Sequence, residues 1–132
     1  MRILLVEDDE SIREVFKLYL ETETPFDGLS VDVACNGTQA IKQIGAVKPD
    51  LVLLDLTLPG QHGFEVFKKI QALEGCQALP VVAVTAHNHA ELKKQALDLG
   101  FFGYILKPID FDAELIPLLK DFSEKHSKSS VA

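Results

Sequence analysis

Apolar residues gather in five short runs, and four of these runs are continuous rather than alternating with polar residues. A short continuous run is typical of a strand buried on both faces, as in a parallel sheet that helices cover on both sides. The second run instead alternates apolar and polar side chains, which predicts a strand at the sheet edge with one face in water. The runs occupy residues 3–6, 29–34, 51–54, 81–84 and 104–106.

Helical spacing fills the segments between and after these runs. Apolar or aromatic residues recur at i, i+3, i+4 and i+7 in the first segment, at Ile12, Val15, Phe16 and Tyr19. Similar stripes occupy residues 40–44, 64–70, 92–99 and 111–122. Asn36 and Asp110 precede two of these stripes and are expected N-caps. Pro117 lies inside the last stripe and lacks a backbone N–H, so we expect a kink or a late start of that helix.

Five strand–helix alternations predict an α/β fold built from βαβ units with right-handed crossovers. The length of 132 residues suits one domain with one core. We expect the domain to span residues 1–123. Residues 124–132 are expected to form a polar tail, either a free end or the start of a linker.

Composition narrows the class of protein. The chain has 13 Lys and Arg against 20 Asp and Glu, a formal net charge of −7, which argues against direct binding to nucleic acid. The apolar runs are too short to cross a bilayer, and the chain opens directly on a strand-like run rather than a signal peptide. Two cysteines, Cys35 and Cys76, form no disulfide framework. These features together predict a cytoplasmic protein without membrane association.

Polar residues follow four of the five predicted strands. Glu7-Asp8-Asp9 follows the first, Asp55 the third, Thr85 the fourth and Lys107 the fifth. In an open parallel sheet, ligands bind beyond the carboxyl ends of the strands. We therefore expect these side chains to converge at one edge of the sheet.

The charges of such a cluster favour a divalent cation. Two carboxylates about 4 Å apart repel by roughly 4 kcal/mol at an effective dielectric constant near 20. Glu7, Asp8 and Asp55 against Lys107 leave the site anionic, and no His or Cys beside the acids favours zinc. Mg²⁺ fits best, because it takes one or two carboxylates and keeps waters that phosphate oxygens can replace.

As a set, these motifs resemble the receiver domains of two-component response regulators, the CheY-like superfamily. The resemblance covers about residues 2–122. It includes the spacings of 30 residues from Asp55 to Thr85 and 52 residues from Asp55 to Lys107. It implies a flavodoxin-like (βα)5 fold, a doubly wound five-stranded parallel sheet in the order 2-1-3-4-5, and a cis bond between Lys107 and Pro108. The motifs are Glu7-Asp8, residues 55–60 with Gly63, Thr85-Ala86 and Lys107-Pro108.

The resemblance also implies roles at a magnesium site. Asp55 is the expected phosphoryl acceptor and a metal ligand. Asp8 is the expected direct ligand beside it, and Glu7 would hold a metal-bound water. Thr57 would contribute its backbone carbonyl.

The remaining implied roles concern the phosphoryl group and signalling. Lys107 and Thr85 would bind phosphoryl oxygens, and Thr85 with Tyr104 would form the switch. The implied donor is a sensor histidine kinase or a histidine phosphotransfer protein. The implied output is a downstream effector protein or output domain, controlled through the fourth helix, fifth strand and fifth helix, where a homodimer is also conceivable. Such a domain is not an enzyme toward outside substrates, since it catalyses only its own phosphorylation and dephosphorylation.

Some positions depart from the usual pattern or suggest weaker roles. His62 stands where an acid or Asn often precedes the glycine, and Leu58 replaces the usual Met. Neither belongs to the charge cluster. His87, two residues after Thr85, is a candidate modulator of phosphate lifetime.

Three alternatives share part of the pattern. Residues 55–57 look like the nucleophile loop of haloacid dehalogenase-type phosphatases, but those enzymes place their further metal carboxylates downstream, whereas here the acidic pair is upstream. A flavodoxin-like flavin carrier would need a Ser/Thr/Gly-rich phosphate loop after the first strand, where residues 7–9 would repel a phosphate. The third alternative is a receiver-shaped interaction module that is never phosphorylated. A stand-alone regulator and a fragment of a longer protein are both compatible with the sequence.

Overall fold

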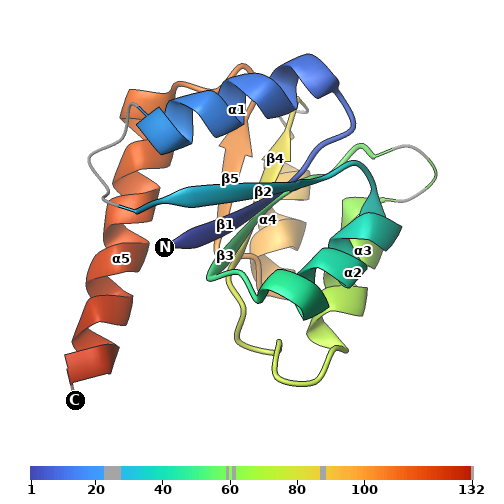
Figure 1. Cartoon of the computed structure of the whole chain (residues 1–132). Coiled ribbons are helices and arrows are strands. Elements are labelled where there is room, and N and C mark those ends of the chain that lie inside the picture. Colours follow the sequence, from blue (N-terminus) through green and yellow to red (C-terminus); the bar gives the residue numbers. More distant parts are fainter. Residues whose placement is uncertain (23–27, 59, 61, 87–88, 132) are drawn as a thin grey trace.

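A computed structural model describes residues 1–22, 28–58, 60, 62–86 and 89–131. Five parallel strands form one sheet in the order β2-β1-β3-β4-β5 (Figure 1). The strands are β1 (Arg2–Val6), β2 (Ser30–Ala34), β3 (Leu51–Asp55), β4 (Val81–Thr85) and β5 (Gly103–Leu106). The helices are α1 (Glu10–Thr22), α2 (Gly37–Val47), α3 (Gly63–Gln71), α4 (Ala90–Leu99), the π-helical turn η1 (Phe111–Leu115) and α5 (Ile116–Val131). The predicted (βα)5 fold and its strand order are confirmed.

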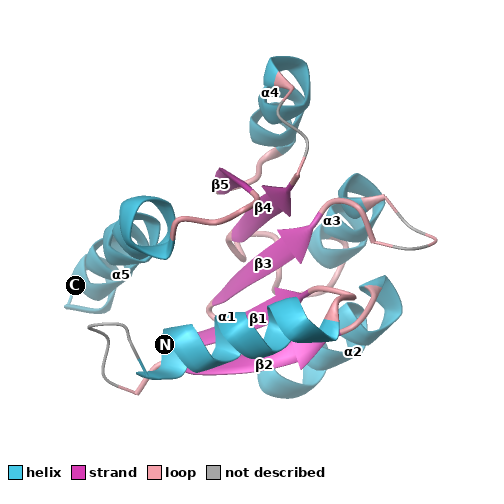
Figure 2. Cartoon of the chain, turned by 90° about the horizontal axis from the view of Figure 1, so that it is seen from above, coloured by secondary structure: helices cyan, strands magenta, loops and turns pink. Residues whose placement is uncertain are grey.

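Helices cover both faces of the sheet (Figure 2). One core packs α1, η1 and α5 against side chains such as Ile3 and Leu53, and the other packs α2, α3 and α4 against their neighbours Leu4 and Leu54. Successive strand residues point to opposite faces, so each central strand must be apolar at every position. The continuous apolar runs follow from this two-sided burial.

β2 lies at the sheet edge, as its alternating pattern predicts. Two side chains of α1 bond to the backbone of this strand. Lys17 Nζ donates to the carbonyl of Val31 at 2.7 Å, and Glu21 Oε2 accepts from the N–H of Val31 at 3.0 Å. Edge strands present unpaired backbone groups that can recruit other chains. The Lys17–Glu21 pair covers this edge at Val31.

Side chains at the predicted helix starts cap the helices. Asn36 accepts a hydrogen bond from the N–H of Gln39 at 2.9 Å, and Asp110 accepts one from the N–H of Ala113 at 3.0 Å. Both predicted N-caps are therefore confirmed. The α-helical part of the last helix begins only at Ile116, after the π-helical turn, which confirms the predicted late start near Pro117. The N–H of Ile116 donates to the carbonyl of Phe111, so Pro117 follows a π-helical turn and not a free helix end.

The polar C-terminal segment is helical as far as Val131, because α5 continues through it. The domain limit at residue 123 stays a prediction. Within the described ranges, no helix is both long enough and apolar enough to span a membrane.

Gly63 brings α3 against the end of β3. Its N–H donates to the carbonyl of Leu56 at 3.0 Å. A Cβ at this position would lie 2.5 Å from Leu56 Cδ2 and 2.7 Å from Leu56 Cα. Only glycine allows this approach, which fixes the backbone immediately after Asp55.

Candidate functional site

Four neighbouring strands deliver polar side chains to the same edge of the sheet. Glu7 directly follows β1, Asp55 ends β3, Thr85 ends β4, and Lys107 directly follows β5. Sheet-like hydrogen bonds continue past the last two strands, since the N–H of Lys107 donates to the carbonyl of Thr85 at 2.8 Å. The convergence predicted from strand ends is confirmed.

Lys107 bridges two buried carboxylates. Its Nζ lies 2.9 Å from Glu7 Oε2 and 3.1 Å from Asp55 Oδ2. Glu7 is 2% exposed and Asp55 is 3% exposed. Removing one partner of a buried charged pair leaves an uncompensated charge, which is strongly destabilising. One ammonium group therefore holds together residues from three strands.

Asp55 is bonded through both carboxylate oxygens. Oδ2 faces Lys107, while Oδ1 accepts hydrogen bonds from the N–H and the hydroxyl of Thr57, each at 2.9 Å. The family resemblance implied a contribution from the backbone carbonyl of Thr57 and gave no sign of these two donors. An Asp that bonds the backbone two residues on is a common turn motif, and Asp55-Leu56-Thr57 carries that signal.

The protonation states follow from burial and these bonds. Burial raises the pKa of Glu7 and its hydrogen bond with Asp55 raises it further, to about 7, although Lys107 opposes both. Burial also raises the pKa of Asp55, but the hydrogen bonds with Glu7, Thr57 and Lys107 outweigh it and hold that pKa below its ordinary value. Burial lowers the pKa of Lys107, and the bonds with Glu7 and Asp55 more than reverse this, so it is raised. Asp55 is thus the carboxylate kept ionised.

Asp8 completes an acidic group that suits a hard cation. Glu7, Asp8 and Asp55 each offer a carboxylate oxygen, and these oxygens lie within 4.8 Å of one another. Asp8 is exposed, whereas the other two are buried, so a cation could enter from the Asp8 side. Three carboxyl groups and the one ammonium group of Lys107 leave the site with negative charge that a cation would neutralise. Oxygen ligands with access to water are what Mg²⁺ requires, so the donor set fits this ion.

The two expected switch residues lie on the same face of neighbouring strands. Tyr104 pairs in register with Ala83, two residues before Thr85. Thr85 is fully buried, while Tyr104 is partly buried and packs against the core under α2, α3 and α4. Burial raises the pKa of Tyr104, so its phenol stays neutral. The coupled movement of the two residues stays a prediction.

Comparison with known proteins identifies the family to which this geometry belongs. The family model of the response regulator receiver domain matches residues 3–119. The chain belongs to this receiver family. The resemblance seen in the sequence motifs is confirmed.

Relatives differ in length. An uncharacterized 14.6 kDa protein from the sodA1 3′ region of Leptolyngbya boryana is 34% identical over 122 residues, which are 92% of this chain and 89% of that protein. The DNA-binding response regulator MtrA of Mycolicibacterium paratuberculosis is 38% identical over 107 residues, which are 81% of this chain but 44% of MtrA. The match therefore covers less than half of MtrA.

Solved receiver structures share the fold. The signal receiver domain of a DNA-binding response regulator (merR) from Colwellia psychrerythraea has a TM-score of 0.85 at 27% identity, covering 94% of this chain and 98% of that one. The non-phosphorylated HemR receiver domain from Leptospira biflexa has a TM-score of 0.78 at 34% identity, covering 92% of each chain.

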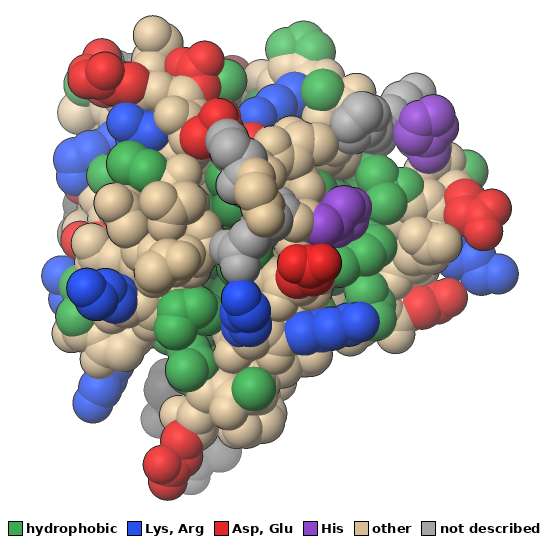
Figure 3. All heavy atoms as spheres, turned by 90° about the vertical axis from the view of Figure 1, so that its right-hand side faces the viewer, with side chains coloured by type: hydrophobic (Ala, Val, Ile, Leu, Met, Phe, Trp, Pro, Cys, Tyr) green, Lys and Arg blue, Asp and Glu red, His purple; other side chains and the backbone are tan. Residues whose placement is uncertain are grey.

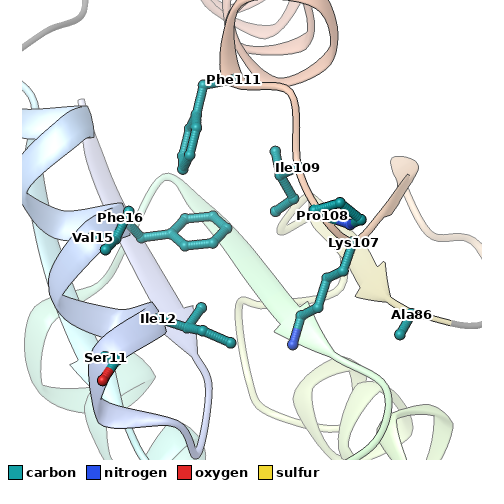
Figure 4. Close-up of a pocket in the computed structure, with 9 residues that line it drawn as sticks. All are labelled: Ser11, Ile12, Val15, Phe16, Ala86, Lys107, Pro108, Ile109 and Phe111. Carbon is teal, nitrogen blue, oxygen red and sulfur yellow. The ribbon is translucent and has the colours of Figure 1, made fainter.

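An apolar groove of about 490 Å³ opens beside the receiver site (Figure 4). Lys107 lines one end, and α1 faces the segment after β5 across it. Val15, on α1, is 57% exposed at this groove. Val15 belongs to the stripe of helical spacing at residues 12–19, but that spacing alone does not tell which apolar residues of a stripe are covered. The lining residues are Ser11, Ile12, Val15, Phe16, Ala86, Lys107, Pro108, Ile109 and Phe111.

The residues with weaker expected roles differ in what they contact. His62 caps α3, since its Nδ1 accepts from the N–H of Phe64 at 3.1 Å. Leu58 is buried in the core. The bond between Lys107 and Pro108 is cis, as the family resemblance implied. His87 lies outside the described residues, so its role stays a prediction.

In a chelator, the receiver domain is expected to lose stability as pH rises from about 4.5 to about 7, the interval between the ordinary and the folded-state pKa of Glu7. Within it, folded Glu7 keeps a proton that the unfolded chain releases, so the free energy of unfolding falls as pH rises. Urea unfolding followed by circular dichroism should show wild type losing stability relative to Glu7→Gln, by at most about 1.4 kcal/mol per pH unit.

Glu14→Gln, a substitution of an exposed acid on α1, is the matched control and should follow the wild-type profile. Parallel profiles for wild type and Glu7→Gln would contradict the raised pKa of Glu7.

Proposed function

We propose that this receiver domain accepts a phosphoryl group on Asp55 from a phosphohistidine of a sensor histidine kinase or histidine phosphotransfer protein. The observation that supports this most directly is the state of Asp55. It is buried and held ionised, with Lys107 on one oxygen and Thr57 on the other. A buried carboxylate that is kept ionised is prepared to act as a nucleophile toward phosphorus.

The proposed transfer forms one bond and breaks one. An Asp55 oxygen attacks the phosphorus, the P–N bond to the histidine breaks, and the imidazole nitrogen takes the electron pair. Phosphoryl transfer depends mainly on positioning and charge neutralisation. Lys107 can then exchange its bond to Asp55 Oδ2 for a phosphoryl oxygen without leaving the site.

Magnesium would be held by Asp8, Asp55 and the backbone carbonyl of Thr57, with Glu7 binding a metal water. The ion would supply charge that neutralises phosphoryl oxygens. An acyl phosphate of about −2 beside Glu7 and Asp8 exceeds what Lys107 alone can balance. We therefore infer that phosphorylation requires a divalent cation.

The same chemistry suggests how the signal leaves the site. A new phosphoryl group offers Thr85 a hydrogen-bond acceptor at the end of β4, and Tyr104 lies on the same sheet face one strand away. A ligand shifts a two-state equilibrium through its differential contacts with the two states. We propose that the inward state of Tyr104 changes the α4–β5–α5 surface, where Leu97 and Leu99 are exposed.

The downstream partner is proposed to be an effector protein or an output domain. MtrA and the Colwellia protein are named as DNA-binding regulators. The receiver itself is a poor DNA ligand, because its formal net charge is −7. On the face shown in Figure 3, acidic and basic side chains are interspersed rather than gathered by sign. Any DNA contact is therefore assigned to the output partner.

Acetyl phosphate with Mg²⁺ should add one phosphoryl group to the wild type, detected by intact mass. Asp55→Asn should abolish the gain, because the amide lacks the nucleophilic carboxylate. Asp98→Asn, which removes an exposed acid on α4, is the matched control and should leave it unchanged. Full phosphorylation in excess chelator would contradict the metal requirement, and phosphorylation of Asp55→Asn would contradict the acceptor.

The groove beside Lys107 is proposed to receive the phosphodonor protein, because a donor histidine must approach Asp55 from the open end of the site. The test uses a phosphohistidine protein that phosphorylates wild type. Val15→Asp should slow phosphoryl transfer from this protein by about tenfold or more, because the contact would desolvate the new carboxylate. The rate with acetyl phosphate should not change. Leu97→Asp, at an exposed leucine of α4, is the control for the groove.

Equal slowing of both reactions by Val15→Asp would show that the site itself was disturbed. Unchanged transfer from the donor protein would place the docking contact elsewhere.

A further inference from the structure

Arg13 contacts the loop that carries the two acidic residues at the end of β1. Its Nη1 donates hydrogen bonds to the backbone carbonyls of Glu7 and Asp8, each at 2.9 Å. Arg13 lies at the end of the first turn of α1 and is half-buried. A single guanidinium nitrogen therefore ties the start of this helix to both acidic residues through their main chain.

The choice of partners is unusual for an arginine in so acidic a segment. Residues 7–10 and Glu14 supply five carboxylates close in sequence. Yet among the residues that the structure describes, no carboxylate oxygen is paired with the Arg13 guanidinium within 4.0 Å. Arg13 thus brings positive charge to the loop without covering the carboxylate oxygens that a cation needs.

Asp8 depends on this backbone support. In the described part of the chain, its carboxylate makes no hydrogen bond or ion pair, although it lies in the group of oxygens within 4.8 Å of one another. Glu7 is different, because Lys107 holds its side chain directly. The direction of the Asp8 side chain is set by the peptide groups on either side, and Arg13 binds the carbonyls of both Glu7 and Asp8.

The far side of the loop is fixed independently. The N–H of Ile12 donates to Asp9 Oδ1 at 3.1 Å, which caps α1, and the N–H of Asp9 donates to Glu7 Oε1 at 3.4 Å. The turn from β1 to α1 can therefore form without Arg13. What Arg13 adds is the orientation of the peptides that flank Asp8.

We propose that Arg13 is a positioning residue of the divalent-cation site, which holds Asp8 in place against Asp55 before the ion arrives. This inference rests on the proposed Mg²⁺ role of the acidic group. Partners that orient metal ligands commonly change metal affinity by about 10- to 100-fold when they are removed. Loss of the guanidinium charge acts in the opposite direction, because the guanidinium repels Mg²⁺ and its removal alone would strengthen binding.

The test measures Mg²⁺ affinity by calorimetry on the full chain, together with urea unfolding in chelator. Arg13→Gln should weaken Mg²⁺ binding about tenfold or more. Arg13→Lys keeps the charge and one flexible donor group, so it should lose less. Lys17→Gln removes a cation one turn further along α1, where Nζ bonds Glu21 and Val31, and should keep wild-type affinity.

The outcomes separate this inference from the proposed function. If wild type does not bind Mg²⁺, both fail together. If wild type binds and Arg13→Gln binds equally well, or if Lys17→Gln is weakened as much, the positioning role alone is overturned. Should Arg13→Gln not fold, Arg13→Lys decides: a folded Arg13→Lys with wild-type affinity would assign Arg13 to the fold and overturn the inference.

Discussion

The bridge from Lys107 to Glu7 and Asp55 is the interaction on which the site depends. Two buried carboxylates a few ångströms apart would repel each other, and burial alone would push protons onto both. The ammonium, 2.9 Å from Glu7 and 3.1 Å from Asp55, opposes this at both acids, and the two hydrogen bonds that Thr57 donates to Asp55 separate their behaviour. Glu7 takes the raised pKa and Asp55 the lowered one. The fold therefore keeps Asp55 ionised, whereas Glu7 retains its proton to a higher pH.

Much of the fold could be predicted because its determinants are local or periodic. Buried strands must be apolar at every position when helices cover both faces, so their positions are visible in the sequence. Asn36 and Asp110 indicate helix starts, because their side chains accept hydrogen bonds from backbone N–H groups of the first turn. Pro117 delays the α-helical part of the last helix because it lacks an N–H. The strand order could not be predicted in this way, because no local signal specifies it. It came only from the family resemblance.

The candidate site could be predicted as a set of residues but not as a set of bonds. Parallel strands bring Asp55 and Lys107 to one edge, so topology supplies the convergence. Which oxygen Lys107 contacts, and that Thr57 donates twice to Asp55, depends on side-chain rotamers that no spacing reveals. Arg13 was missed for a related reason, since its partners are backbone carbonyls and leave no complementary charge pattern in the sequence.

We propose that three acids and one lysine form a single pocket for a magnesium ion. A crystal structure grown with saturating Mg²⁺ tests it most directly. The account predicts an ion with carboxylate oxygens of Asp8 and Asp55 at about 2.1 Å, with water in the remaining positions and Lys107 still at the edge of the pocket. An ion bound elsewhere, with Asp8 turned to solvent and the pocket beside Asp55 holding only water, would contradict it.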